Sequence, residues 1–351
     1  MYNYLVEPFD YNDIVLDLHD ISLLLTYERG ITEPRFRHAK LREVATGLSD
    51  FQTIKLPDAP KPKWSEATIP RTGYVFVKPK QSLSKAESEE LDLPSNMLLK
   101  PVSTSLQNLS SKQLETYYWQ PRNHDGCYRT VRLFQHFMDL FPSEFTRIMV
   151  RAVANNKPRT YTTLASDRLI IEMKLRGPKS MNFTCALPEG RSYVTGSDEV
   201  SAHVVLAFPA PSDADDPQTI LDLASLQFGD AGRGCKGRGL FVLEPVQQYK
   251  ERLKNFADGN NFLEDKITQR ITSTPDDDFL KNVANRAKER WEKRKTDFWC
   301  GHCGSPARND PLLRCSKCQQ AHYCNSEHQL AAWPFHKHFC VDPSAPKPQW
   351  V

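Results

Sequence analysis

Cys300-Gly-His-Cys303 opens a run of closely spaced metal-binding side chains near the end of the chain. A second cysteine pair and four further donors follow it: Cys315-Ser-Lys-Cys318, Cys324, His328, His336 and Cys340. Thiolates and imidazoles are ligands that zinc prefers, and a structural tetrahedral site takes four of them. The donors therefore predict two zinc ions. Because protein side chains fill every position, we expect structural zinc without an open position for substrate.

The segment Cys300–Cys340 resembles the MYND-type zinc finger. The resemblance rests on the ligand spacing, on Tyr323 and Gln329, and on the closing Trp333-Pro-Phe-His336-Lys-His-Phe-Cys340. It implies an interleaved pairing of the ligands. One zinc would be held by Cys300, Cys303, Cys324 and His328, and the other by Cys315, Cys318, His336 and Cys340.

Histidine at position 328 departs from the commoner pattern of the family, which has cysteine there. Imidazole is an equally good zinc ligand, so we keep His328 in the predicted set. Three other histidines, His302, His322 and His338, lie one or two residues from a predicted cysteine ligand. A tetrahedral chelate is awkward at that spacing, so we expect them to lie outside both ligand sets.

The resemblance implies protein–protein interaction, commonly with short proline-containing peptides. Tyr323, Trp333 and Phe335 could supply an aromatic surface for such a peptide, or they could pack the small core of the finger. Six thiolates and two zinc ions would bring the charge of the finger close to zero. We therefore expect no nucleic-acid binding by the finger, since phosphate contacts dominate that affinity.

The composition of the whole chain agrees with an intracellular protein. Its 351 residues carry 46 basic and 43 acidic side chains, a balance unlike that of nucleic-acid-binding proteins. The mean hydropathy is −0.56, and no apolar run is long enough to span a membrane. No secretory signal is visible at the N-terminus. We expect reduced cysteines and a location in the cytoplasm and/or nucleus.

The sequence as a whole predicts an α+β fold: a mixed helix/strand body, a long connector helix and a small two-zinc cross-braced finger. The expected units are an N-terminal extension over 1–100, partly irregular, a body over 101–272, a connector helix over 274–298, the finger over 300–340 and a proline-containing tail over 341–351. Thr274-Pro-Asp-Asp277 is a strong start for the connector helix.

Periodicity predicts the main elements of the body. Apolar residues from Ile14 to Leu25 recur at helical spacing near the N-terminus. Further helices are expected at Ser111–Tyr118 and Tyr128–Phe141. Strands are expected at Tyr74–Val77, Leu169–Met173, Asn182–Leu187, His203–Phe208, Ile220–Leu223 and Leu240–Leu243. Helices followed by a run of strands are typical of α+β folds.

A second group of residues points to thiol chemistry. Cys127 stands at the start of a predicted helix, and His203 and Asp222 stand on predicted strands. This order resembles that of transglutaminase-like and papain-fold thiol enzymes. The resemblance implies a thiol-dependent hydrolase or acyltransferase, in which Cys127 is the nucleophile, His203 its base and Asp222 the group that orients the ring. Gln120 is a candidate oxyanion donor.

A plain structural interpretation of these three residues stays open. Cysteine is among the most buried residue types, and His203 and Asp222 could be ordinary strand residues. Convergence of the three side chains within hydrogen-bonding reach is the observation that separates the two interpretations.

Lys236-Gly-Arg-Gly-Leu-Phe241 resembles the opening motif of SET-domain methyltransferases, some of which also carry a MYND finger. In those proteins most of the methyltransferase domain follows the finger, whereas eleven residues follow Cys340 here. We regard a SET-type methyltransferase as the less favoured alternative. Gly237 and Gly239 are expected to form a turn before a strand.

Overall fold

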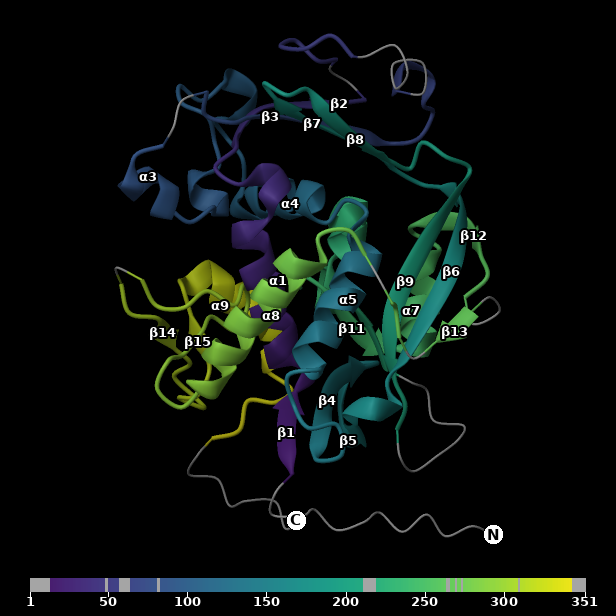
Figure 1. The fold of residues 1–351 in the computed structure, drawn as a ribbon, viewed down its shortest axis with the longest axis vertical. Helices are drawn as coiled ribbons and strands as arrows, with labels where there is room; N and C mark the ends of the chain where they lie inside the picture. The colour runs from purple at the N-terminus through teal and green to yellow at the C-terminus, as the bar shows by residue number, and fades with distance from the viewer. Residues whose placement is uncertain are drawn as a thin grey trace.

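The computed structural model describes residues 13–47, 50–56, 64–80, 83–210, 219–262, 266–268, 270–272, 274–308 and 310–342. These residues form an α+β fold with a small finger at its C-terminal end, as the sequence predicts (Figure 1). Most of the predicted proline-containing tail lies outside the described residues. Among the helices described, none is long and apolar enough to cross a membrane.

Three helices pack together in the centre of the molecule: α1 Leu18–Thr32, α5 Gly126–Met138 and α8 Asp277–Glu292 (Figure 1). The predicted helices at Tyr128–Phe141 and after Thr274 are thereby confirmed. The apolar side of α8 is fully covered, through Leu280, Val283, Ala284, Ala287 and Trp291. The helix predicted as a connector is thus part of the core of the body, and only its opposite face is solvated.

The first helix begins later than its periodicity predicts. Ile14–Asp17 forms strand β1, which pairs in parallel with β4 Thr146–Ala154. The carboxylate of Asp17 accepts hydrogen bonds from the backbone N–H groups of His19 and Asp20, so the helix is capped at Asp17. The prediction of helix at Ile14 is therefore wrong, because strand pairing with a distant segment takes that residue.

The main sheet has the strand order β11-β10-β9-β6-β12, and β13 also pairs with β6. Its strands are β6 Leu169–Pro178, β9 Val200–Phe208, β10 Thr219–Asp222, β11 Val242–Pro245, β12 Ala257–Asn260 and β13 Lys266–Thr268. Neighbouring residues point to opposite faces. Val204 and Leu206 meet the core that contains α5, whereas Val205 and Ala207 meet α7 Val246–Leu253. Helices thus cover both faces of the sheet.

A second, four-stranded sheet has the order β2-β3-β7-β8 and lies at one end of the molecule, beyond helix α4 Ser111–Arg122 (Figure 1). Its strands are β2 Lys40–Thr46, β3 Arg71–Val77, β7 Met181–Leu187 and β8 Arg191–Thr195. Strand β3 confirms the prediction at Tyr74–Val77, and β7 confirms the prediction at Asn182–Leu187. Because β3 pairs in parallel with β7, part of the N-terminal hundred residues is built into the body.

The remaining elements connect these layers. Helix α4 Ser111–Arg122 confirms the predicted helix there and is capped by Ser110. The turn predicted at Gly237 and Gly239 is confirmed, since Gly237 has a φ of 70° and Gly239 bridges back to Gly234 before β11 begins. The other elements are η1 Pro34–Phe36, α3 Lys85–Glu89, η2 Pro94–Asn96, η3 Thr104–Leu106, β5 Lys157–Leu164, η4 Ala165–Asp167, η5 Ser225–Gly232, α6 Gly234–Gly237, β14 Leu313–Arg314, β15 His322–Tyr323 and α9 Ser326–His336.

Candidate functional site

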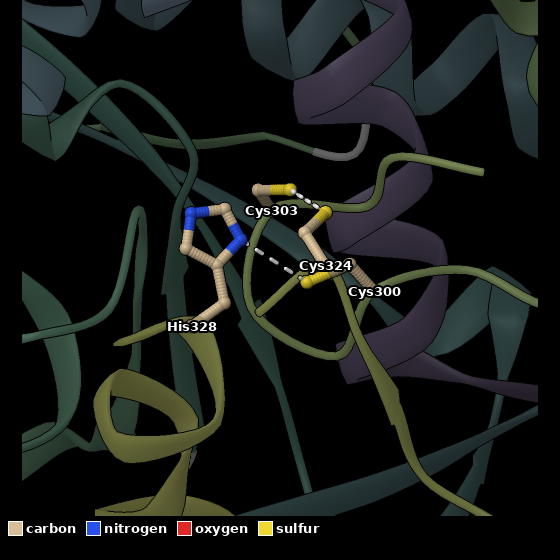
Figure 2. A group of neighbouring side chains, drawn as sticks. All are labelled: Cys300, Cys303, Cys324 and His328. Atoms are coloured by element: carbon tan, nitrogen blue, oxygen red, sulfur yellow. Dashed lines mark hydrogen bonds between the residues drawn. The ribbon is translucent and has the colours of Figure 1, made fainter. Parts of the chain in front are cut away.

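The first metal-ligand cluster joins two parts of the finger. Cys300 and Cys303 lie in the turn that follows α8, Cys324 follows β15, and His328 lies in the first turn of α9 (Figure 2). The Sγ atom of Cys300 is 3.4 Å from Nδ1 of His328. The Sγ atoms of Cys303 and Cys324 are 3.7 Å apart. All four donor atoms thus surround one point.

The second cluster consists of Cys315, Cys318, His336 and Cys340. The Sγ atoms of Cys315 and Cys340 are 3.8 Å apart. The Sγ atom of Cys318 is 3.5 Å from Nε2 of His336. The two sets interleave along the chain, so the predicted pairing of all eight ligands agrees with the structure.

These spacings fit zinc and do not fit disulfides. Zinc–sulfur bonds of about 2.3 Å and zinc–nitrogen bonds of about 2.0 Å at tetrahedral angles place sulfurs roughly 3.8 Å apart, and sulfur and nitrogen roughly 3.5 Å apart. The observed distances are 3.7 and 3.8 Å between sulfurs, and 3.4 and 3.5 Å between sulfur and nitrogen. All described cysteines are free thiols. The residues present therefore fit two structural zinc ions.

Local backbone geometry holds the donors in place. A left-handed residue follows each Cys-x-x-Cys pair, Gly304 with a φ of 77° and Gln319 with a φ of 56°. These turns direct the N–H groups of Gly304 and Gln319 back to the carbonyls of Cys300 and Cys315, both at 2.9 Å. The side chain of Asn325 caps α9 by accepting from the N–H of His328 at 2.9 Å.

Two of the three competing histidines have other partners in the structure. Nε2 of His302 is 2.7 Å from Oε1 of Glu115, which belongs to α4 of the body. The ring of His322 stacks on Phe298 with centroids 4.2 Å apart. His302 and Glu115 also approach His328 closely, but His328 already belongs to the first cluster. Neither His302, His322 nor His338 belongs to the two four-ligand clusters, as the sequence predicts.

The finger packs on the body. The carbonyl of Gly304 accepts from Arg290 of α8 at 2.6 Å, and Arg308 donates to the hydroxyl of Tyr27 of α1 at 2.9 Å. A side chain at Gly304 would collide with the carbonyl of Leu23, since a Cβ there would lie 2.5 Å from that oxygen. The ring of Phe335 stacks on His19 with centroids 4.0 Å apart.

A cleft of about 700 Å³ runs between the finger and the body. Its walls include Leu330 and Ala331 of α9 on the finger side, and Leu114 and Tyr118 of α4 on the body side. Of the three aromatic candidates, Tyr323 and Phe335 are buried, whereas Trp333 is 42% exposed beside Leu330, which is 64% exposed. Trp333 and Leu330 are therefore the large apolar side chains of α9 that remain open to solvent.

Cys127, His203 and Asp222 converge in the body, where the N-terminal end of α5 meets strands β9 and β10. Cys127 is the second residue of α5, His203 lies on β9, and Asp222 ends the neighbouring antiparallel strand β10. Nε2 of His203 is 2.9 Å from Oδ2 of Asp222, and the Cys127 thiol lies close enough to His203 to raise the pKa of its ring. The three side chains are 5%, 1% and 1% exposed.

The electrostatics of this group favour a proton on the imidazole. Burial by itself lowers the pKa of His203, but the charge of Asp222 and the hydrogen bonds to Asp222 and Cys127 outweigh burial. Together they raise the pKa of His203 from its ordinary 6.5 to about 10. An imidazole with these two neighbours can accept the proton of a thiol.

Two further residues contact the group, and neither was predicted from the sequence. The hydroxyl of Tyr249 on α7 donates to Oδ2 of Asp222 at 2.9 Å. The amide of Gln227 lies 3.3 Å from Nδ1 of His203. The candidate oxyanion donor Gln120 is buried nearby, where it accepts from the Tyr74 hydroxyl and donates to the carbonyl of Gln227 at 3.2 Å. No motif marks Gln227 or Tyr249, because the fold alone brings them to the group.

Comparison with known proteins identifies the finger. The family model of the MYND finger matches residues 300–340, which contain both ligand clusters. Neither the curated proteins nor the solved structures include a significant match to the chain. The match and the donor geometry together assign a zinc-binding MYND finger to this segment.

Proposed function

We propose that this chain is a protein-interaction protein whose MYND finger recognises a proline-containing peptide in the cleft between finger and body. The cleft of about 700 Å³ carries the proposal, because α9 and α4 supply apolar walls to it. A proline-rich segment is extended and already ordered, so it loses little entropy on docking against such walls. Leu330, one of the residues that line the cleft, is 64% exposed and offers an apolar contact to the peptide.

A peptide titration tests this function. Full-length zinc-loaded protein is titrated with fluorescent peptides that contain two or three prolines, with alanine-substituted peptides as controls. Leu330→Asp is expected to weaken binding about tenfold, because it places a charge in an apolar contact. Leu313→Asp is the matched control, since Leu313 is also exposed but lies on β14 and not among the residues that line the cleft.

Two results would contradict the proposal. The first is the same affinity for the proline and alanine peptides. The second is equal binding by Leu330→Asp and Leu313→Asp, with two zinc ions retained by both variants. Inside the cell, we place the protein in the cytoplasm and/or nucleus, in keeping with its free thiols.

The convergence of Cys127, His203 and Asp222 supports a second candidate function, that of a thiol-dependent hydrolase or acyltransferase. The Cys127 sulfur would attack an acyl carbon and form a thioester, while His203 takes the thiol proton and passes it to the leaving group. Water or an acyl acceptor would then cleave the thioester and restore the thiol. Asp222 would hold the ring through the 2.9 Å contact.

Labelling of Cys127 separates the two functions. The rate of alkylation by iodoacetamide at pH 7 is measured for the Cys127 peptide by mass spectrometry. Under the enzyme proposal, His203→Ala lowers this rate at least tenfold, because the thiol loses its base. Cys185 serves as an internal control, since burial raises the pKa of its thiol. Equal labelling of Cys127 in wild type and His203→Ala would leave the interaction function alone.

A further inference from the structure

The segment Ser225–Arg233 packs against His203, and we call it the lid segment. It lies between β10 and α6 in the chain. Its Gln227 and Phe228 contact the ring of His203, and Phe228 lies edge-on to that ring with centroids 5.4 Å apart. The buried state of His203 is thus maintained partly by residues that belong to one short segment.

Gln227 engages the ring nitrogen that Asp222 leaves free. Nε2 of His203 faces Asp222 and Tyr249, and Nδ1 faces the amide of Gln227 at 3.3 Å. A ring nitrogen makes one good hydrogen bond, whether or not it carries the proton. Gln227 therefore occupies Nδ1, the ring nitrogen that could otherwise accept a proton from a thiol. In this arrangement the amide hinders proton transfer between thiol and imidazole, and the segment also hinders access to the sulfur.

The lid segment has backbone features of a movable piece. Its helical turns are interrupted at Gly229, where φ is 62° and ψ is −140°, a conformation that favours glycine. On one side of this break Phe228 stacks on Phe256, with centroids 4.0 Å apart. On the other side the segment is held mainly by polar contacts, which can exchange with water at moderate cost.

Those polar contacts lead to the zinc finger. Asp230 accepts from Thr116 of α4 at 2.7 Å and from Arg233 at 3.1 Å. Arg233 in turn donates to Oε2 of Glu115 at 2.7 Å, and Oε1 of Glu115 is 2.7 Å from Nε2 of His302 in the finger. Arg233 and His302 are 1% and 4% exposed. The end of the lid segment is thus joined to the finger through Glu115.

We propose that the lid segment is an autoinhibitory lid, closed over Cys127 and His203 in this structure and latched to the finger through Arg233 and Glu115. Opening would release Nδ1 of His203 to Cys127 and admit a substrate. The physiological meaning of the lid rests on the proposed thiol chemistry. The closure of the lid can be tested without that chemistry, because it also limits the access of a reagent to the Cys127 sulfur.

The alkylation rate of Cys127 tests the lid. Full-length zinc-loaded protein is treated with iodoacetamide at pH 7, and the Cys127 peptide is quantified by mass spectrometry. Gln227→Ala is expected to raise the rate about tenfold, since it removes the contact to Nδ1. Gln247→Ala, an exposed glutamine on α7, is the matched control and should label at the wild-type rate.

A second variant tests the latch. Glu115→Gln keeps the shape of the side chain but removes its charge from Arg233 and His302, and it should raise the rate about threefold. Glu89→Gln, on the exposed helix α3, is its control. Zinc content and thermal unfolding are recorded for each variant, so that unfolding is not mistaken for opening.

The outcomes separate the lid from the proposed enzyme. Labelling of folded Gln227→Ala and Glu115→Gln at the wild-type rate would overturn the lid, whatever the effect of His203→Ala. Fast labelling of Gln227→Ala that persists in Gln227→Ala/His203→Ala would support the lid and contradict the thiol chemistry. Fast labelling that falls again in the double variant would support both.

Discussion

His328 offers Nδ1 to the first ligand cluster, whereas His336 offers Nε2 to the second. The choice at His328 follows from its place in the first turn of α9, next to the Asn325 cap. From this position the ligand atom must lie close to the backbone to reach the side of Cys300, and Nδ1 is the ring nitrogen nearer to the backbone. Cysteine, the commoner residue of the family at this position, is also a short ligand.

We predict that His328→Ala binds one zinc ion per chain and that His328→Cys binds two. A site with three protein ligands exposes its metal to water and loses affinity, whereas a thiolate replaces the imidazole directly. Elemental analysis of purified protein gives the ratio. Two zinc ions in His328→Ala would instead mean that His302, whose ring centroid is 4.9 Å from that of His328, has moved into the vacant position.

Glu33, the C-cap residue of α1, is a buried carboxylate surrounded by guanidinium groups. Its side chain has no exposed surface and contacts Arg35 at 2.7 Å, Arg129 at 3.3 Å and Arg29 at 3.8 Å. Burial alone would raise the pKa of Glu33, but these guanidinium groups lower it from 4.5 to about 2. Because the pKa is lower in the folded state, the charge stabilises the fold above about pH 4.5, and this contribution is lost as the pH falls through about 2.

We predict that Glu33→Gln lowers the free energy of unfolding by about 3 kcal/mol at pH 7 and by roughly half as much at pH 3. Urea titrations at both pH values measure the difference from wild type. Glu89→Gln, an exposed substitution on α3, should change stability little at either pH. An equal loss for Glu33→Gln at pH 7 and pH 3 would contradict the assignment of the charge.

Single-residue predictions from the sequence succeeded where chemistry is encoded by local spacing. The eight zinc ligands belong to this class, because the two Cys-x-x-Cys pairs and the two later pairs can be recognised in the sequence without knowledge of the fold. Gln227 and Tyr249 belong to the opposite class. They lie 24 and 46 residues from His203 in the chain, and only the pairing of β9 with β10 and the packing of α7 bring them to its ring.

At the level of elements, α8 joins the two remaining central helices into one core. Asp277, in its first turn, accepts from Arg132 of α5 at 2.8 Å and faces Nε2 of His136 at 2.9 Å. Farther along, Arg286 and Arg290 contact Glu28 of α1 at 3.1 and 3.0 Å. The many basic residues of this helix are thus partly used for contacts within the chain.

We predict that Leu280→Ala destabilises the whole body by about 3 kcal/mol, because Leu280 is 0% exposed and its removal leaves a cavity. Lys281→Ala, its exposed neighbour, removes ion pairs with Asp277 and Asp278 and should change stability little, because solvent screens these pairs. Equilibrium unfolding followed by near-ultraviolet circular dichroism measures both. A loss of helical far-ultraviolet signal at a lower urea concentration than the loss of near-ultraviolet signal would show that α8 unfolds separately from the body.

Element boundaries depended on partners that lie far away in the sequence. Strands β6, β9, β10 and β11 of the main sheet were predicted because continuous apolar runs mark them, whereas the short strands β12 and β13 were missed. Strand β4 was missed, although Ile148, Val150 and Ala152 alternate with polar or exposed positions and are all buried. Strand β1 was assigned to a helix, because its four residues are too few to show a period of two and are fixed by β4 alone.

At the scale of the whole molecule, the finger is seated on α1, and the sequence did not predict this contact. Arg308 and Tyr27 are 281 residues apart in the chain, and no periodicity connects positions so distant. This packing contact explains why position 304 is glycine, because the backbone carbonyl of Leu23 leaves no space for a Cβ there. It also means that the fold of the finger and the order of α1 are physically linked.

Removal of zinc should therefore loosen α1 as well as the finger. Structural zinc contributes of order 10 kcal/mol to the folding of such a small unit, so a chelator is expected to unfold residues 300–340. Arg308 would then leave Tyr27, and Phe335 would leave His19, which removes part of the cover of α1.

Hydrogen exchange followed by mass spectrometry should show faster exchange in the finger and over Leu23–Ile31. Strands β9 and β10 should exchange as before, because both faces of the sheet are covered by helices of the body. Unchanged exchange in α1 after complete loss of both zinc ions would show that the finger rests on the body without supporting it.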